Sequence, residues 1–422
     1  MNRLRSLGAL VAGAIVLAAI YGVVYSNGSG SAGIAAEHGD GVRHIVSGDR
    51  GEFSLRLEDF EITANWRGDY ELNSDGDDIA SLERKLDIKR EKNGVKERVV
   101  FDRDGDDVER IYYLDGEEQE SGPETQEAIQ SVLASFLGAS GVKAEERVAI
   151  LLRNGGPAEV INLIDEVYGD HARQRYTAEL TEQADLSTEE LSALLEIVKQ
   201  IEGDHDLRLA LSAIVENETI RADQAPLILE AANRIESDYD LRRLIESVAD
   251  HPLGADALPL AIGLLTHIDS DHDLRRSGEA LLEQENLTAE NAAQLLETVS
   301  NKIESDHDLR LLLSEAGAFL GQDEVSSAAW IRAFGALDSD HDKRIVLAEV
   351  AELDDISTDV VIALINATTD IESNHDRRIA LESFANRARA EARLRMAYEM
   401  SARAMNSQSD RERALAAIGA DD

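Results

Sequence analysis

The sequence contains no cysteine and few aromatic residues, and each shortage excludes a class of protein. Without cysteine, the chain has no disulfide, no thiolate metal site and no cysteine nucleophile. Aromatic residues make up 4% of the 422 residues, whereas hydrophobic residues make up 43%. The hydrophobic residues are mostly leucine, alanine, isoleucine and valine, which is typical of packed helices rather than of a disordered chain.

Basic residues are scarce as well. The chain has 42 lysines and arginines against 84 aspartates and glutamates, a formal net charge of −42. Nucleic-acid binding needs a basic surface, so we expect no nucleic-acid partner, and an anionic lipid headgroup is disfavoured as the main partner. The nucleophile-elbow and P-loop motifs are absent, and no G-x-G-x-x-G follows a strand and opens a helix. We therefore predict a non-enzymatic protein without a cofactor.

One long uncharged run lies near the N-terminus. Leu7 to Tyr25 is a 19-residue stretch without charge, preceded by Arg3 and Arg5. At 1.5 Å per residue its length of about 28 Å matches the hydrocarbon core of a bilayer. We predict a membrane anchor over residues 1–25, with the rest of the chain outside the cytoplasm, and a flexible linker over 26–40. The alternative is a cleaved signal peptide.

Residues 41–120 change to a period of two. Phe53, Leu55 and Leu57 alternate with polar residues, as do similar sets further along, which predicts strands with one buried face. Asn93-Gly94 and three Asp-Gly pairs separate these runs, and such pairs are strong hairpin signals. We predict a small antiparallel module of about six strands.

The acidic segment 102–107 within this module suggests a calcium loop. An EF-hand needs glycine at position 6 and glutamate at position 12, but here glycine is fourth. We interpret the segment as an acidic hairpin turn, because Asp-Gly is a common turn pair.

The remaining residues, 123–422, contain an internal repeat. One phrase recurs with small changes: IEGDHDLR at Ile201, IESDYDLR at Ile235, IDSDHDLR at Ile268, IESDHDLR at Ile303, LDSDHDKR at Leu337 and IESNHDRR at Ile371, with degenerate copies from Val167 and Asn406. From His171 to His375 the spacings are 34, 34, 33, 35, 34 and 34 residues. A helical period of this length predicts an acidic α-solenoid of about seven or eight helical hairpins.

Each phrase has the composition of a helix start. A serine or glycine is followed three residues later by aspartate, as in Ser237 and Asp240, which predicts an N-cap and an acidic third helical residue. Apolar residues then recur at helical spacing, and another helical segment precedes each phrase, such as the one that starts at Ser187. Each unit is therefore predicted to be helix A, a short turn and helix B.

Each phrase also places an acid six residues before an arginine. This pattern resembles HEAT repeats, in which a turn acid and a helix-B arginine form a ladder between neighbouring units. The resemblance implies a structural ladder of Glu202 and Arg208, Glu236 and Arg242, Asp269 and Arg275, Glu304 and Arg310, Asp338 and Arg344, and Glu372 and Arg378. An acid–arginine contact of this kind would be charge-assisted and would fix the rotation between units.

The repeat places a histidine in the same position of most units, with Tyr239 in one. One histidine per stacked helix does not converge on a metal ion, and a tyrosine in the same place suggests a ring packed against the turn. A pH-responsive row of histidines is the alternative, because histidine titrates near neutral pH. We predict no metal site.

The order of the segments resembles the extracytoplasmic C-terminal regions of bla-regulator-type membrane metallopeptidases. The similar stretches are DDIASLERKLDIKREKNGVKERVVFDRDGDDVERIYYLDGEEQ and the repeats. The H-E-x-x-H motif of those peptidases is absent, so the resemblance implies a sensing or scaffolding role without peptidase activity. It also implies a single-pass protein of the bacterial inner membrane, with most of the chain in the periplasm.

These features predict a membrane-anchored scaffold or sensor that binds a protein; the alternative is a regulator that responds to cations or pH through its acidic and histidine-bearing turns. Helix B lines the concave face of HEAT-like arrays, and here it carries Glu246, Glu279, Glu315, Glu349 and Glu382. We predict that this acidic face binds a basic or extended protein segment.

Overall fold

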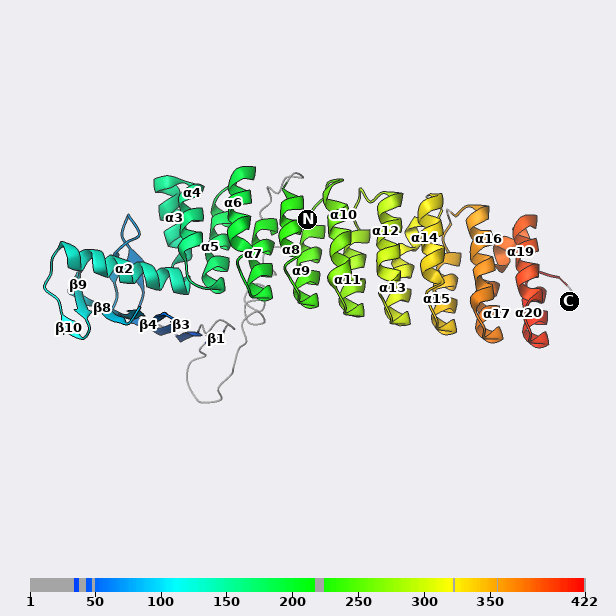
Figure 1. Ribbon diagram of the computed structural model, residues 1–422. Coiled ribbons are helices and arrows are strands. Elements are labelled where there is room, and N and C mark those ends of the chain that lie inside the picture. Colours follow the sequence, from blue (N-terminus) through cyan, green and yellow to red (C-terminus); the bar gives the residue numbers. More distant parts are fainter. Residues whose placement is uncertain are drawn as a thin grey trace, which may run out of the picture. The chain divides into compact units, whose positions relative to one another are not determined.

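The structure is a computed structural model that describes residues 34–37, 43–47, 50–216, 224–321, 323–354 and 356–420. The chain is mainly α-helical, with a small antiparallel β module near its N-terminal end and a helical-repeat array after it (Figure 1). It divides into two compact units, Met1–Thr219 and Ile220–Asp422. Among the described residues no helix is long and apolar enough to cross a membrane, and the predicted anchor lies outside them.

The main sheet has eight antiparallel strands in the order β1-β2-β3-β4-β7-β8-β9-β10, and β5 and β6 form a separate pair. The strands are β1 (Ile34–Glu37), β2 (Arg43–Ser47), β3 (Arg50–Arg56), β4 (Phe60–Arg67), β5 (Tyr70–Leu72), β6 (Ile79–Leu82), β7 (Lys85–Lys92), β8 (Val95–Asp104), β9 (Asp107–Leu114) and β10 (Glu117–Glu118). Asn93-Gly94 joins β7 to β8 with positive φ at both residues, as the hairpin signal predicts. The acidic segment 102–107 is the hairpin between β8 and β9.

The module differs from its prediction in extent and in one core residue. It has more strands than the predicted six, and β1 lies inside the predicted linker 26–40. Phe53 and Leu55 are fully buried, but Leu57 lies beyond the end of β3 and is 38% exposed. The alternation therefore stops at Arg56, where the chain leaves the ladder.

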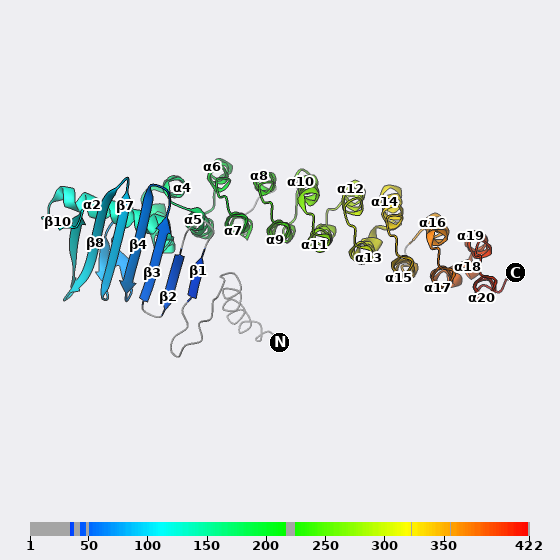
Figure 2. The ribbon, with the colours of Figure 1, turned by 60° about the horizontal axis from the view of Figure 1, so that its bottom comes forward.

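Helix α2 (Pro123–Ser140) covers one face of the sheet (Figure 2). Its buried side chains, Val132, Leu133 and Phe136 among them, share one hydrophobic core with β3, β4, β7 and β8. The Arg90 side chain reaches from β7 to α2, where it donates to the carbonyl of Ser131. Helix α2, which the prediction assigned to the solenoid from residue 123, thus shares the core of the β module.

The first unit continues with five further helices, which are α3 (Ala144–Gly155), α4 (Pro157–Glu166), α5 (Asp170–Gln183), α6 (Thr188–Val198) and α7 (Asp204–Glu216). The module is joined to these helices by specific contacts. Tyr168 stacks on Phe60 with ring centroids 4.2 Å apart, and the Glu146 carboxylate accepts the backbone N–H of Leu72. The Tyr176 hydroxyl, fully buried, donates to the carbonyl of Leu137.

The second unit consists of helix pairs in two rows (Figure 2). The helices are α8 (Ala225–Ala232), α9 (Asp238–Ala249), α10 (Ala257–Leu264), α11 (Asp271–Leu282), α12 (Ala289–Ser300), α13 (Asp306–Glu315), α14 (Glu324–Phe334), α15 (Asp340–Ala351), α16 (Thr358–Ala367), α17 (Asn374–Ser383), α18 (Ala385–Ala390), α19 (Ala392–Arg403) and α20 (Gln408–Ala417), with short 3-10 turns η1 (Leu265–His267), η2 (Ala316–Phe319) and η3 (Thr368–Asp370). Each repeated phrase is the turn into a helix B. This arrangement confirms the helical hairpins predicted from the repeat.

The serines of the phrase are the N-caps of helix B. The hydroxyl of Ser237 accepts the backbone N–H of Asp240, and the same contact recurs in the later units. The equivalent caps are Ser270, Ser305, Ser339, Ser373 and Ser407. Apolar residues from successive units fill the space between the two helix rows, with Leu241, Leu274 and Leu309 almost completely buried.

Candidate functional site: polar ladders between repeat units

The turns of neighbouring units are joined by a backbone clamp. In this clamp the first residue of a helix B accepts two backbone N–H groups from the turn of the following unit. The Asp306 carboxylate, for example, accepts the N–H groups of Asp338 and Ser339, both at 2.8 Å. The N–H groups lie 2.7–3.2 Å from their acceptors. The acceptor is Asp170 within Met1–Thr219, and the acceptors within Ile220–Asp422 are Asp238, Asp271, Asp306, Asp340 and Asn374.

A second set of contacts between neighbouring repeat units, the arginine ladder, lies beside the clamps in Ile220–Asp422. One arginine in each helix B from α9 to α17 forms an ion pair with the third residue of the next helix B, an aspartate. The Nε–Oδ1 distances are 2.5 Å for Arg242–Asp273, 2.8 Å for Arg275–Asp308, 2.9 Å for Arg310–Asp342, 3.0 Å for Arg344–Asp376 and 3.1 Å for Arg378–Asp410. Most of these side chains are largely buried, so an unpaired member would be costly.

The ladder shifts the pKa values of its members. Burial opposes the charge of Arg275, but hydrogen bonds to Glu279 and Asp308 outweigh it and raise the arginine pKa. Burial acts on Asp308 in the opposite direction, and its hydrogen bonds with Ser305 and Arg275 hold its pKa below the ordinary value. A hydrogen bond with Ser407, then the contact with Arg378, lowers the pKa of Asp410. All these groups are therefore charged at neutral pH.

The acid of the ladder is not the one that the HEAT resemblance implied. In the ion pairs described for residues 224–420, the arginines contact the aspartate of the next helix start, whereas the turn acids contribute their backbone N–H groups to the clamps. The carboxylate of Asp269 pairs with Lys302 at 2.9 Å instead. Glu202, Glu304, Asp338 and Glu372 are exposed, and so is Glu236. For Arg275, Arg310, Arg344 and Arg378 the ladder therefore uses a different acid from the predicted one.

The five glutamates predicted to form a binding face belong to two different environments. Glu246, Glu279 and Glu382 each pair with the arginine four residues before them, at 2.6–2.9 Å, and so belong to the arginine ladder. Glu315 and Glu349 lie one position further along their helices and are exposed, and Glu349 accepts a hydrogen bond from Ser314. Because arginines already neutralise three of the five, these residues do not form one uniform anionic face.

The repeated histidines contact the ladder arginines. In each case the histidine Nδ1 lies beside a guanidinium nitrogen three residues later, at 3.0–3.4 Å. The pairs are His205–Arg208, His272–Arg275, His307–Arg310, His341–Arg344 and His375–Arg378. In one unit Tyr239 takes the place of the histidine. The guanidinium of Arg242 lies over the tyrosine ring, with Cζ 5.1 Å from the ring centroid. A ring at this position of the repeat therefore contacts the guanidinium of the arginine three residues later. Where the ring is a histidine, Nδ1 can accept an arginine N–H only when Nδ1 is unprotonated.

In the described part of the chain, no group of three or more histidine, aspartate or glutamate side chains is placed to hold a metal ion. The five histidines that contact arginines each lie beside the arginine three residues later, and His171 lies 4.0 Å from Asp206.

Comparisons with known proteins add little. No family model matches the chain, and no curated protein matches it. A solved structure from work on the computational design of self-assembling cyclic protein homooligomers aligns with 66% of this chain and 93% of its own, at 18% identity and a TM-score of 0.13. That likeness is too weak to carry an argument. The resemblance to bla-regulator-type metallopeptidases therefore remains a prediction from the sequence.

Proposed function

We propose that the protein is a non-enzymatic scaffold or sensor, anchored in the bacterial inner membrane by its N-terminal run, that binds a basic or extended protein segment outside the cytoplasm. The observation that carries this proposal is a row of exposed turn acids, Glu304, Asp338 and Glu372, which we call the turn-acid row. Within the described residues none of the three has an ion-pair partner, in contrast to the paired glutamates of helix B.

The backbone clamps hold the turn-acid row in place. The residues that carry these carboxylates donate their backbone N–H groups to Asp271, Asp306 and Asp340. One carboxylate is therefore presented per unit, at the 8–10 Å spacing of packed helices. A fixed row of this kind suits a partner with regularly spaced cations. The backbone that carries the carboxylates is already held by the clamps, so it does not have to be ordered when the partner binds.

Binding of a lysine peptide tests the row. The variant E304Q/D338N/E372Q should bind a 12-residue oligolysine more weakly than the unmodified chain, with a smaller dependence on salt. The control E290Q/E324Q/D354N removes the same charge from exposed acids elsewhere in the same units. Equal weakening by both variants would show that the peptide senses only the net charge, and would overturn the row as the binding surface.

The anchor is tested separately. A reporter that is active only in the cytoplasm, fused after Asp422, should be silent, because Arg3 and Arg5 keep the N-terminal end inside. A bright reporter would contradict the proposed topology.

A pH-responsive regulator is the second candidate, and the repeated histidine–arginine contact favours it. Protonation of Nδ1 would remove the acceptor and place an imidazolium next to a guanidinium, in several units at once. The aspartates on either side, such as Asp306 and Asp308 around His307, would partly compensate that charge.

The natural tyrosine unit supplies the control. If the histidines sense pH, replacing His272, His307, His341 and His375 with tyrosine should remove a change in thermal stability between pH 7.5 and 5.5. An unchanged pH profile in that variant would show that the histidines only pack against the arginines.

A further inference from the structure

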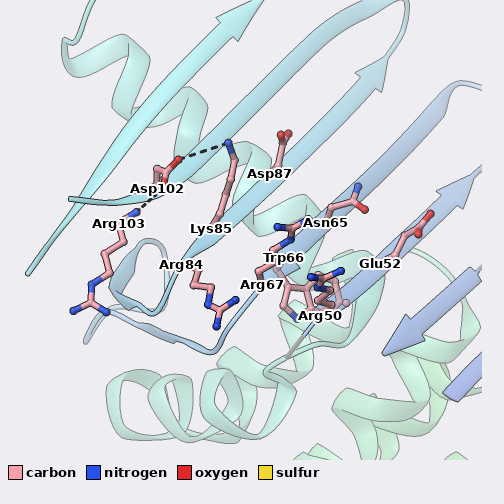
Figure 3. Close-up of a pocket in the computed structure, with 11 residues that line it drawn as sticks. Arg50, Glu52, Asn65, Trp66, Arg67, Arg84, Lys85, Asp87, Asp102 and Arg103 are labelled. Atoms are coloured by element: carbon pink, nitrogen blue, oxygen red, sulfur yellow. Dashed lines mark hydrogen bonds and ion pairs between the residues drawn. The ribbon is translucent and has the colours of Figure 1, made fainter. Parts of the chain in front are cut away.

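The β module carries a stripe of basic residues although the chain as a whole is strongly acidic. On the sheet face that α2 leaves uncovered, Arg50 lies opposite Arg67, and Arg67 lies opposite Lys85, on three neighbouring strands. We call these three residues the basic stripe. Arg84 and Arg103 are at the same end of the sheet, and all five line a shallow depression of about 800 Å³, which three acids, Glu52, Asp87 and Asp102, line as well (Figure 3).

The basic stripe is not required by the fold. Like charges directly opposite each other in a sheet are destabilising, and their side chains lie only about 5 Å apart at Cβ. Lys85 has one carboxylate, Asp102, at 3.6 Å. Arg50 and Arg67 are exposed, and among the described residues neither has an ion-pair partner. Two uncompensated arginines side by side, in a chain with twice as many acids as bases, indicate an anionic ligand from outside the module.

The other end of the same sheet face is different. There Arg56 forms an ion pair with Glu61 at 2.9 Å, and Lys96 lies 3.9 Å from Glu91. Both pairs join neighbouring strands, so the cations at that end are already matched within the sheet. Lys89, further along β7 on the same face, is exposed without an ion-pair partner among the described residues, but only at the first end do two such cations, Arg50 and Arg67, lie directly opposite each other.

The strand register shows which end this is. Ile34, the first residue of β1, pairs with Val46, and Ser47 pairs with Arg50. The chain therefore enters the sheet at the end that carries the basic stripe. Only eight residues, 26–33, lie between Tyr25, the end of the uncharged run, and Ile34, so these two residues are at most about 32 Å apart.

We propose that the basic stripe docks the β module onto anionic phospholipid headgroups next to the anchor, a proposal that rests on the anchored topology of the proposed function. Arginine guanidinium groups bind phosphate oxygens in bidentate fashion, and basic residues close to a membrane bind its anionic lipids. The net charge of the whole chain disfavours such lipids as its main partner. The proposed anchor nevertheless makes this local contact effective, because it holds the basic stripe at a high local concentration of headgroups.

Energy transfer to labelled lipids in nanodiscs tests the docking. The chain has no cysteine, so Asn65→Cys, which lies beside the stripe, gives a single site for a donor dye, and the headgroup of a trace lipid carries the acceptor. The full chain is reconstituted in discs of phosphatidylcholine alone or with phosphatidylglycerol. We expect stronger transfer in the anionic discs, and loss of the difference at 1 M salt, where the Debye length is about 3 Å.

Matched charge variants identify the residues responsible. Each basic side chain near an anionic surface strengthens association about fivefold, so R50Q/R67Q should lower the ratio of docked to undocked chains about 30-fold. The control R56Q/K96Q removes the same charge from the other end of the face and should leave the transfer unchanged.

The outcomes separate the two proposals. If the chain does not copurify with the discs, the anchor is wrong and the docking proposal falls with it. If it copurifies but the transfer is the same in both lipids, or in both charge variants, the anchor stands and the docking proposal is overturned.

Discussion

The β module and the helical array are stabilised by different kinds of contact. The module buries large side chains in one continuous core, with the Phe136 ring of α2 6.1 Å from that of Phe53 and 5.9 Å from that of Trp66. The array buries mostly aliphatic residues between helix pairs, with a few rings such as Trp330 and Phe334, and adds charged contacts from each turn to the next.

The difference follows from how each region repeats. Strands of the module pair with partners in a fixed register, so one core joins segments that are distant in sequence. Units of the array contact mainly their neighbours, and apolar packing alone tolerates small rotations between them. The clamps and the arginine ladder remove that freedom, because charge-assisted contacts have narrow geometry. We therefore expect the free energy of unfolding of the array to depend more on its charged side chains, and that of the module to depend more on its buried apolar side chains.

The largest effect should come from the module core. Phe136→Ala removes a fully buried ring, which costs about 3–5 kcal/mol of the free energy of unfolding. Urea unfolding followed by Trp66 fluorescence, with Trp330 replaced by phenylalanine, measures the effect on the module. The control Leu57→Ala, at an exposed residue, should cost less than about 1 kcal/mol. A similar loss in both variants would contradict the assignment of the core.

A smaller loss is expected in the arginine ladder. Arg310→Ala leaves Asp342 without its partner in a largely buried position, which should cost about 1–3 kcal/mol. Unfolding followed by Trp330, with Trp66 replaced by phenylalanine, measures it in the array. Arg332→Ala, at an exposed helix-A position, is the control and should stay within about 0.5 kcal/mol. Equal melting of the two variants would mean that the ladder contributes nothing to stability.

The helix caps should contribute less than the ladder. Ser305→Ala removes the hydroxyl that accepts the N–H of Asp308, which typically costs about 1 kcal/mol. Ser305→Gly should cost only a few tenths of a kcal/mol, because glycine is also tolerated at an N-cap, and Gly203 holds this place in its own repeat. Thermal unfolding of the two variants distinguishes the cap from side-chain packing, since glycine would be the worse residue if packing decided.

The smallest effect is expected from acid titration of one carboxylate. The pKa of Asp308 is lowered in the folded state, so its stabilisation is present above the ordinary aspartate value of about 4 and disappears as the pH falls through the lower folded value. The stability difference between the unmodified chain and Asp308→Asn should therefore shrink below about pH 4. Asp338→Asn, in the exposed turn-acid row, is the control. A difference that persists at pH 2.5 would show that the carboxylate charge is not what stabilises the ladder.

Much of the array could be predicted because its signals are local. The 34-residue period, the serine caps and the apolar stripes each depend on residues within one unit. The acid of the ladder could not be predicted in the same way, because each phrase offers several carboxylates within a few residues. Which of them meets Arg275 depends on the rotation between units, and the second aspartate of DHD, Asp308, is the one brought within 2.8 Å.

In the module the hairpins were predictable and their assembly was not. Asn93-Gly94 predicts its turn because only a few residue types tolerate positive φ. Nothing local indicates that α2 belongs with the sheet, since its apolar stripe would equally suit a neighbouring helix. Similarly, the basic stripe consists of residues from β3, β4 and β7 that are unremarkable one by one.

The sequence by itself determined the starts of the helix-B segments, their caps, the hairpin turns and the repeat period, because these follow from short-range hydrogen bonding and backbone conformation. Only the tertiary structure decided which charges are paired and which are exposed. It paired Glu279, within one helix B, with a ladder arginine and left Glu304, in the turn before the next helix B, exposed. The physical reason is that an ion pair needs two side chains within about 4 Å, and between units that distance is set by the packing of the helices.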